Sequence, residues 1–142
     1  MAKIKHIAIA TQDPEKTATF YMQVFELESV GKINSETAEG YYLSDGNLNL
    51  AILKFKSEVV AGEEFPDGYT GLHHIGFQVD DLADADERLR RSNCQRRAEI
   101  DAVQNLTMGK GHGGRNASSK YTGPDGVMID VSQGGWVGTG ES

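Results

Sequence analysis

A histidine that opens an apolar strand occurs twice in this chain, at the same place in two similar halves. The segment HIAI begins at His6 and the segment HIGF begins at His74. An aspartate suited to start a helix follows each of them, Asp13 in the first half and Asp81 in the second. An internal repeat constrains the fold more than any other feature, because both halves must form the same supersecondary unit. A repeated strand histidine can also bring two imidazoles together across the axis that relates the halves.

Hydrophobic periodicity predicts the same order of elements in both halves, strand, helix and then three strands. Asp13 with Pro14 is a clear helix start, and the Asp-Gly pairs at 45–46 and 125–126 predict tight turns before the last strand of each half. In the first half we expect a helix over 13–26 and strands over 4–10, 27–33, 38–43 and 47–55. In the second half we expect a helix over 81–92 and strands over 73–79, 96–102, 118–122 and 127–132.

These elements predict an α+β fold in which two βαβββ modules form an incomplete, cup-shaped barrel. We expect one domain over 1–142, with module 1 at about 3–55, a linker over 56–70, module 2 at about 71–133 and a Gly-rich tail over 134–142 that Trp136 anchors. Side chains with the same strand parity as His6 and His74 should line the concave surface of the cup.

Composition excludes several classes of function. The net charge of -7 provides no basic face for nucleic acid, and no apolar run approaches the roughly 20 residues of a membrane span. The first residues lead directly into a strand pattern instead of a signal-peptide apolar region. Cys94 is the single cysteine, which fits a reducing compartment. We therefore expect a cytoplasmic protein.

Both halves resemble the vicinal oxygen chelate superfamily, the glyoxalase, bleomycin-resistance and extradiol-dioxygenase fold. The segments that carry the resemblance are HIAI from His6 with the following Asp13 and Phe20-Tyr21, GLHHIGFQVDDL from Gly71, and GPDGVMID from Gly123. They span nearly the whole chain apart from the linker and the tail. The resemblance implies the fold just described, and it leaves the reaction open among isomerases, epimerases, ring-cleaving dioxygenases, thiol transferases and metal-free binders.

The resemblance also implies a ligand set for a divalent metal. The family's four metal positions correspond here to His6, His74, Asp130 and, four residues after Gly46, Leu50. Leu50 cannot bind a metal, and strand alternation directs the neighbouring Asn49 away from the cup unless a bulge turns it inward. Two imidazoles and one carboxylate suit Fe(II), and also Mn, Ni or Zn. The expected site therefore has three protein ligands and open positions for a substrate with two adjacent oxygens.

Four further residues are candidates for contact with a ligand in the cup: Leu50, Met128, His112 and Arg115. The last two belong to a loop over 107–116 that lacks periodicity and carries several glycines. We expect it either to act as a lid that brings His112, Lys110 and Arg115 toward an anionic substrate or to be a disordered hairpin loop.

Two functions of different class follow. One is a glyoxalase-like or dioxygenase-like metalloenzyme, with lyase, isomerase or ring-cleaving chemistry on a small vicinal-oxygen substrate. The other is a metal-free protein that binds and sequesters a small molecule, similar to bleomycin-resistance proteins, for which an acidic chain would suit a cationic drug. The resemblance implies a homodimer in either case, and the sequence indicates neither the substrate nor the general base.

Overall fold

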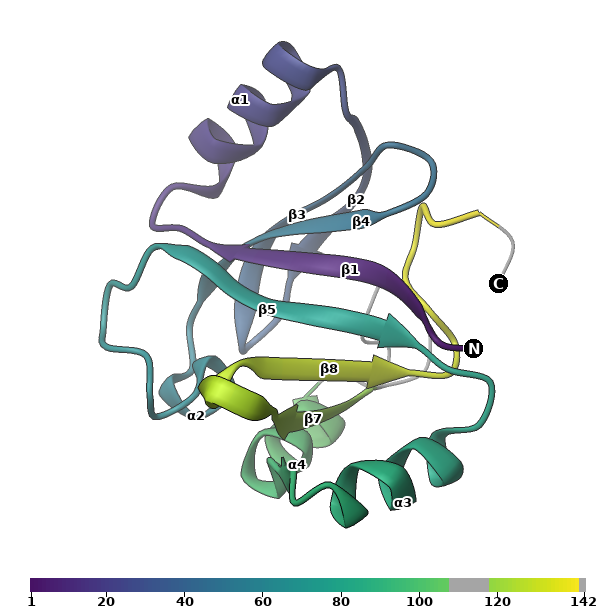
Figure 1. The fold of residues 1–142 in the computed structure, drawn as a ribbon. Coiled ribbons are helices and arrows are strands. Elements are labelled where there is room, and N and C mark those ends of the chain that lie inside the picture. The colour runs from purple at the N-terminus through teal and green to yellow at the C-terminus, as the bar shows by residue number, and fades with distance from the viewer. Residues whose placement is uncertain (108–117, 141–142) are drawn as a thin grey trace.

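Eight strands form one mixed sheet that does not close into a barrel (Figure 1). The computed structural model describes residues 1–107 and 118–140, and only the backbone of 105–107. The strands lie in the order β2-β3-β4-β1-β5-β8-β7-β6. Their bounds are β1 Lys3–Ala10, β2 Glu28–Asn34, β3 Ala38–Ser44, β4 Asn49–Phe55, β5 Gly71–Gln78, β6 Gln95–Arg96, β7 Ser119–Thr122 and β8 Met128–Ser132. The predicted α+β class and the incomplete barrel are confirmed.

The sheet consists of two similar halves joined at its centre. In each half the first strand pairs in parallel with the last, β1 with β4 and β5 with β8. The antiparallel pairing of β1 with β5 joins the halves and places Ala8 opposite His74 and His6 opposite Gly76. The two repeated histidines therefore lie on adjacent strands at the middle of the sheet.

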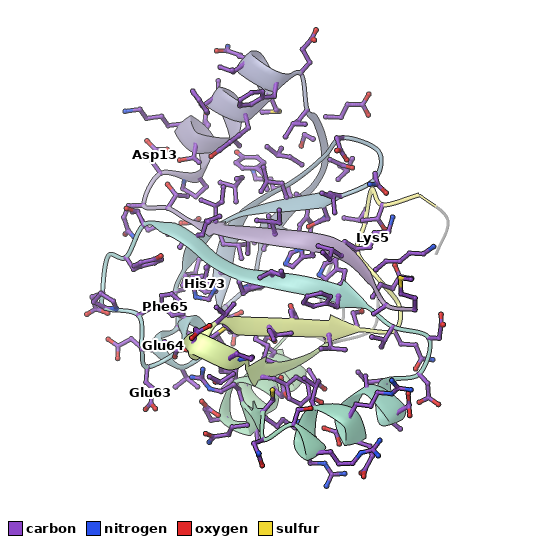
Figure 2. All side chains as sticks on the ribbon, viewed as in Figure 1. Lys5, Asp13, Glu63, Glu64, Phe65 and His73 are labelled. Carbon is purple, nitrogen blue, oxygen red and sulfur yellow. The ribbon has the colours of Figure 1, made fainter. Side chains whose placement is uncertain are left out.

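Two helices begin at the aspartates that the sequence indicated. Asp13 lies at the start of α1, Pro14–Phe25 (Figure 2). Its side chain caps this helix by accepting a hydrogen bond from the Lys16 amide. Asp81 caps α3, Leu82–Arg91, in the same way through the Asp84 amide. Carboxylates at these positions satisfy amides that have no partner within the helix. Among the described residues, no helix is both long enough and apolar enough to cross a membrane.

The predicted strand over 96–102 is wrong. Only Gln95–Arg96 pairs with β7, and the helix α4, Ala98–Thr107, follows. Ile100 and Val103 are three residues apart, so they share one face of this helix, which packs on Val60 and Met128. Helical spacing of these apolar residues, which the sequence reading overlooked, outweighs local strand propensity. A short helix, α2 Glu58–Ala61, also lies in the predicted linker and contacts α4.

Arg97 fastens the linker to the second module. Its guanidinium donates two hydrogen bonds to the Glu64 carboxylate, at 2.7 and 2.9 Å, and a third to Glu99 at 2.9 Å. The Arg97 side chain is only 7% exposed. A paired, two-point contact of this kind holds the linker in place with more geometric precision than a single surface ion pair.

Replacing Arg97 with methionine should destabilise the fold, because Glu64 loses a partner that is largely shielded from water. We expect the free energy of unfolding to fall by about 1–2 kcal/mol, as measured by urea denaturation. The control is Arg88→Met, since Arg88 and Asp84 form an exposed pair on α3 and such pairs contribute about 0.5 kcal/mol or less. Equal losses in the two variants would contradict the assigned role of Arg97.

Candidate metal centre

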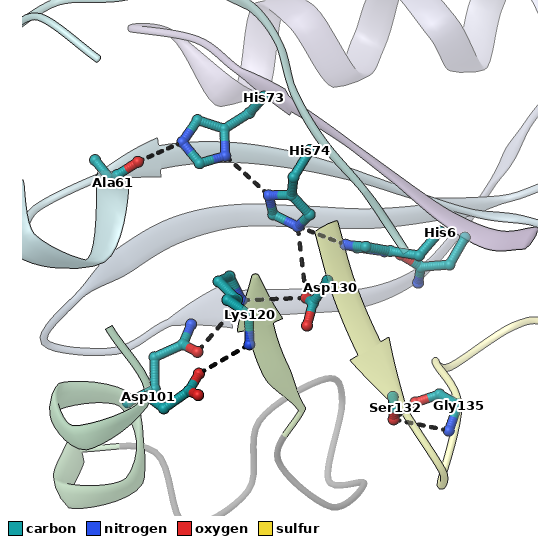
Figure 3. A network of polar contacts seen from close by, with 11 residues as sticks. His6, Ala61, His73, His74, Asp101, Lys120, Asp130, Ser132 and Gly135 are labelled. Atoms are coloured by element: carbon teal, nitrogen blue, oxygen red, sulfur yellow. Dashed lines mark hydrogen bonds and ion pairs between the residues drawn. The ribbon is translucent and has the colours of Figure 1, made fainter. Parts of the chain in front are cut away.

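Three of the predicted site residues meet inside the sheet. One ligand atom from each of His6, His74 and Asp130 lies within 4.8 Å of the other two, and all three side chains are buried (Figure 3). The Nε2 atoms of the two histidines are 3.0 Å apart. The Oδ2 atom of Asp130 lies 3.6 Å from His74 Nε2. The cluster therefore offers two imidazole nitrogens and one carboxylate oxygen to a common point.

Asn49 on β4 fixes the tautomer of His6. The Asn49 amide nitrogen donates to the carbonyl oxygen of Val137 at 2.9 Å, so its Oδ1 faces His6 Nδ1 at 2.7 Å as an acceptor. The Nδ1 atom of His6 must then carry the proton. The lone pair of the neutral ring is consequently on Nε2, the atom that faces His74.

A chain of two hydrogen bonds fixes His74 in the same way. His73 Nε2 lies 2.7 Å from the Ala61 carbonyl oxygen, which can only accept, so this nitrogen carries the proton. Nδ1 of neutral His73 is then an acceptor, and at 2.8 Å it receives the proton on His74 Nδ1. The lone pair of His74 is therefore also on Nε2. Phe55 and Phe65 pack against the His73 ring and hold it in place.

Two lone pairs that face each other at 3.0 Å repel, and a cation between them removes the repulsion. A metal ion fits this arrangement because its histidine ligands are neutral and commonly donate the other ring N–H to a carbonyl or carboxylate group. The 3.0 Å separation of the two Nε2 atoms is short enough for both to bind one ion, since metal–nitrogen bonds are about 2.1 Å long. His6 and His74 would hold such an ion together with Asp130, and other positions would stay open for a substrate.

Burial keeps His73 and His74 neutral. It lowers the pKa of His73 to about 4, partly offset by the hydrogen bond to Ala61. It also lowers the pKa of His74 well below the usual range, with a further contribution from the positive charge of Lys120. Neutral imidazoles are the form that binds metals, so near neutral pH these rings need not lose a proton first.

Trp136 and Gly76 support His6 from the side. The Trp136 ring is fully buried and stacks on the His6 ring with a centroid separation of 4.6 Å. A Cβ atom at Gly76 would lie 2.7 Å from the Cβ of His6 and 2.8 Å from the Trp136 ring. Glycine is needed here because a larger residue would displace either ring. The tail that carries Trp136 is therefore part of the wall of the site.

The predicted orientations of Leu50 and Asn49 were wrong, and the fourth family position is neither of them. Leu50 packs in the cluster beneath α1 with Ala18 and Ile52, so it does not line the cup. Ala8 in the first half corresponds to Gly76 in the second half. Ala8 pairs with Ala51 and Gly76 pairs with Asp130, so Ala51 is the counterpart of Asp130. Counting from the turns failed because β4 begins three residues after Gly46, whereas β8 begins two residues after Gly126.

The other predicted ligand contacts have different outcomes. Met128 lies on the same face of β8 as Asp130, but its side chain is buried in the cluster with Val60 and Ile100. His112 and Arg115 lie outside the described residues, as does the rest of the predicted lid beyond Thr107.

Lys120 is the site residue that the sequence analysis missed. It lies on β7 directly opposite Asp130 on β8, is 2% exposed, and its Nζ is 3.1 Å from Asp130 Oδ2 and 3.3 Å from Gln104 Oε1. Pairing the two predicted strands across the 123–126 turn would have placed these residues opposite each other. A buried ammonium ion thus shares the carboxylate with the metal position.

A cavity of about 50 Å³ opens beside this cluster. His6, His74 and Lys120 provide charged or hydrogen-bonding groups at its wall, with Thr37, Gln104 and Ser118. The rest of the wall is mostly apolar: Ile33, Ala38, Tyr42, Ala51, Leu53, Phe55 and Val60. A water needs about 10–15 Å³ by this measure, so the cavity admits a small molecule or one end of a larger one.

Comparison with known proteins places the chain in a family. The model of the Glyoxalase/Bleomycin resistance protein/Dioxygenase superfamily matches residues 3–131. The chain belongs to this superfamily, as the repeated strand histidines and the paired βαβββ halves indicated. No curated protein matches the sequence.

Solved structures share the fold at low sequence identity. Methylmalonyl-CoA epimerase in complex with methylmalonyl-CoA and NH4+ is 19% identical, covers 92% of this chain and 93% of its own, and has a TM-score of 0.72. A Streptomyces coelicolor methylmalonyl-CoA epimerase variant in complex with 2-nitronate-propionyl-CoA is 20% identical, with 91% and 94% covered and a TM-score of 0.69. A hypothetical protein from Bacillus halodurans C-125 is 18% identical, with 92% of each chain covered and a TM-score of 0.69.

Replacing His73 with phenylalanine should weaken metal binding without touching a ligand. Phenylalanine keeps the ring between Phe55 and Phe65 but removes the acceptor that fixes the tautomer of His74. We expect the affinity for Zn²⁺ to fall about 10- to 100-fold, as measured by competition with a chromophoric chelator. The control is Phe65→Leu, which disturbs the same ring packing but keeps the hydrogen bonds. A comparable loss in both variants would show that packing, and not the tautomer, is responsible.

The depressed pKa values predict that acid destabilises the metal-free protein. In the unfolded chain histidine titrates near pH 6.5, whereas folded His73 titrates near pH 4. Between these values the unfolded state binds more protons, so stability is fully present above pH 6.5 and decreases as the pH falls toward 4. His73 alone should account for about 3 kcal/mol of this loss. Urea denaturation with chelator present should show this loss of stability in wild type and a smaller loss in His73→Phe. The same pH dependence in both proteins would contradict the lowered pKa of His73.

Proposed function

We propose that this protein is a metalloenzyme whose divalent ion is held by His6, His74 and Asp130. The observation that carries the proposal is the convergence of two Nε2 lone pairs, each fixed by a separate hydrogen-bond partner, beside a buried carboxylate. This ligand set suits Fe(II), and also Mn, Ni or Zn. When bound, such an ion polarises a chelated substrate and stabilises the negative charge that develops on its oxygens.

The ligand count restricts the reaction class. Ala51 is the counterpart of Asp130, and its side chain has no donor atom for a metal. The ion would therefore have three protein ligands and open positions for two adjacent oxygens of a substrate. A proton transfer of the epimerase or glyoxalase type needs a base beside the substrate, and among the described residues that line the cavity none is a carboxylate. The site therefore favours ring-cleaving dioxygenase chemistry, with its three protein ligands, over an isomerase or lyase reaction with a carboxylate base.

Lys120 favours a second candidate function. Its ammonium group already neutralises Asp130 at 3.1 Å, so the buried carboxylate has a cationic partner without any metal. In this alternative the same cavity binds and sequesters a small molecule without chemistry, as in metal-free members of the superfamily. The two functions differ in whether the imidazoles bind a metal ion.

Metal content separates these candidates. Protein purified without chelator, loaded with divalent metal and then dialysed should contain close to one equivalent of metal by mass spectrometry. The His74→Ala and His6→Ala variants should each lose it, because two of three ligands cannot hold the ion against dialysis. The matched control is Asp84→Asn, which removes an exposed carboxylate of α3 that does not belong to the cluster.

Two results would contradict the metalloenzyme. One is wild-type protein that takes up no divalent metal under any loading condition, which would favour the metal-free binder. The other is metal that remains in both histidine variants, which would place the bound ion elsewhere. Melting temperatures of all variants, recorded with chelator present, show whether a loss of metal results from unfolding.

A further inference from the structure

The ammonium group of Lys120 lies in the wall of the cavity, beside the candidate metal centre. Lys120 lines the cavity together with His6 and His74, and its side chain is almost completely buried. Register fixes this position, because Lys120 on β7 pairs with Asp130 on β8 (Figure 3). A long cationic side chain that normally reaches water is therefore kept inside the protein at the point where a ligand would bind.

The hydrogen bonds of Lys120 leave one donor for a ligand. An ammonium group carries three N–H donors. Its Nζ contacts Asp130 at 3.1 Å and Gln104 at 3.3 Å, and no third partner lies among the described residues. The remaining N–H can be given to an acceptor in the cavity, and an anionic oxygen is the acceptor that forms the shortest and strongest bond.

The net charge of the site with a divalent ion bound also favours an anionic ligand. Asp130 and a divalent ion together have a net charge of +1, since both imidazoles are neutral, and Lys120 raises it to +2. The surrounding wall is mostly apolar, with Ile33, Leu53 and Phe55 among its residues. A net charge buried in such surroundings is costly unless a bound group neutralises it.

We infer that Lys120 selects the ligand of this site by charge: it binds the anionic oxygen of a small hydroxy- or oxo-carboxylate, enolate or catecholate whose two adjacent oxygens reach the metal position. The inference deepens the proposed function by naming the substrate class, and its metal-loaded measurement rests on that function. It also rejects a cationic ligand, which the overall charge of -7 had suggested, because the cavity wall carries a positive charge.

Glycolate and glycolamide test this inference, because they have nearly the same size and the same two adjacent oxygens but differ by one negative charge. Their dissociation constants are measured by NMR of the methylene protons, with Zn²⁺-loaded wild type, Lys120→Met and Lys120→Arg. We expect the preference of wild type for glycolate over glycolamide to fall about 10- to 100-fold in Lys120→Met. Lys120→Arg should retain most of it, because the positive charge remains. The contribution of Zn²⁺ to the preference is common to all three proteins and cancels in the comparison.

The inference is overturned if wild type and Lys120→Met show the same preference, or if glycolate does not bind to wild type. Zinc content is measured on the same samples, so a failure of the metal proposal is recognised separately. If wild type binds no zinc, the same pair is measured on metal-free protein, where loss of the glycolate preference in Lys120→Met still supports the role of Lys120 and an unchanged preference refutes it. Should Lys120→Met fail to fold, Lys120→Gln, which also removes the positive charge, replaces it in the comparison.

Discussion

The antiparallel pairing of β1 with β5 is the interaction on which the rest of the structure depends. It joins the two halves of the sheet and sets the Nε2 atoms of His6 and His74 3.0 Å apart. A shift of one residue in this register would direct one histidine to the opposite face of the sheet. The register shifts in the pairing of β1 with β5, between Ile4 and His6 and between Ala8 and Ile9, therefore contribute to the directions in which the two histidines point.

Segments far from the sheet centre determine the chemical state of the site. The Ala61 carbonyl group of the linker accepts the hydrogen bond that orients His73 and, through it, His74. The Val137 carbonyl group of the tail orients Asn49 against His6. Arg97 fixes the linker, and Trp136 fixes the tail by stacking on His6. The linker and the tail thus support the site, because they hold the lone pairs of His6 and His74 toward one point.

The sequence predicted the parts of the fold that rest on repetition and local chemistry. The repeat gave the two modules, Asp13 and Asp81 gave the helix starts, and the three residues His6, His74 and Asp130 were named before the structure placed them together. Helix α4 was missed because the strand assignment ignored the spacing of Ile100 and Val103. The helix starts need only neighbours along the chain, whereas the three ligand residues were implied by the resemblance to the superfamily.

The positions of several site residues depend on differences between the two halves, and the similarity of the halves conceals these differences. The two turns differ by one residue in their distance to the next strand, so Ala51 and not Leu50 matches Asp130, and Asn49 faces the cup. Lys120 was overlooked because a single lysine in a strand is usually exposed at the edge of a sheet. Its importance appears only when the strand pairing places it opposite Asp130, which no count of charges along the chain reveals.

The proposed site requires that His6 and His74 present unprotonated Nε2 atoms to one cation. Nitrogen-15 NMR of the imidazole rings tests it most directly, before and after addition of Zn²⁺ near neutral pH. We expect protons on Nδ1 of both rings in the zinc-bound protein, and a simultaneous change of both Nε2 signals as zinc binds, while His73 keeps its proton on Nε2. A proton that stays on either Nε2 in the presence of bound zinc, or zinc binding that leaves both Nε2 signals unchanged, would contradict it.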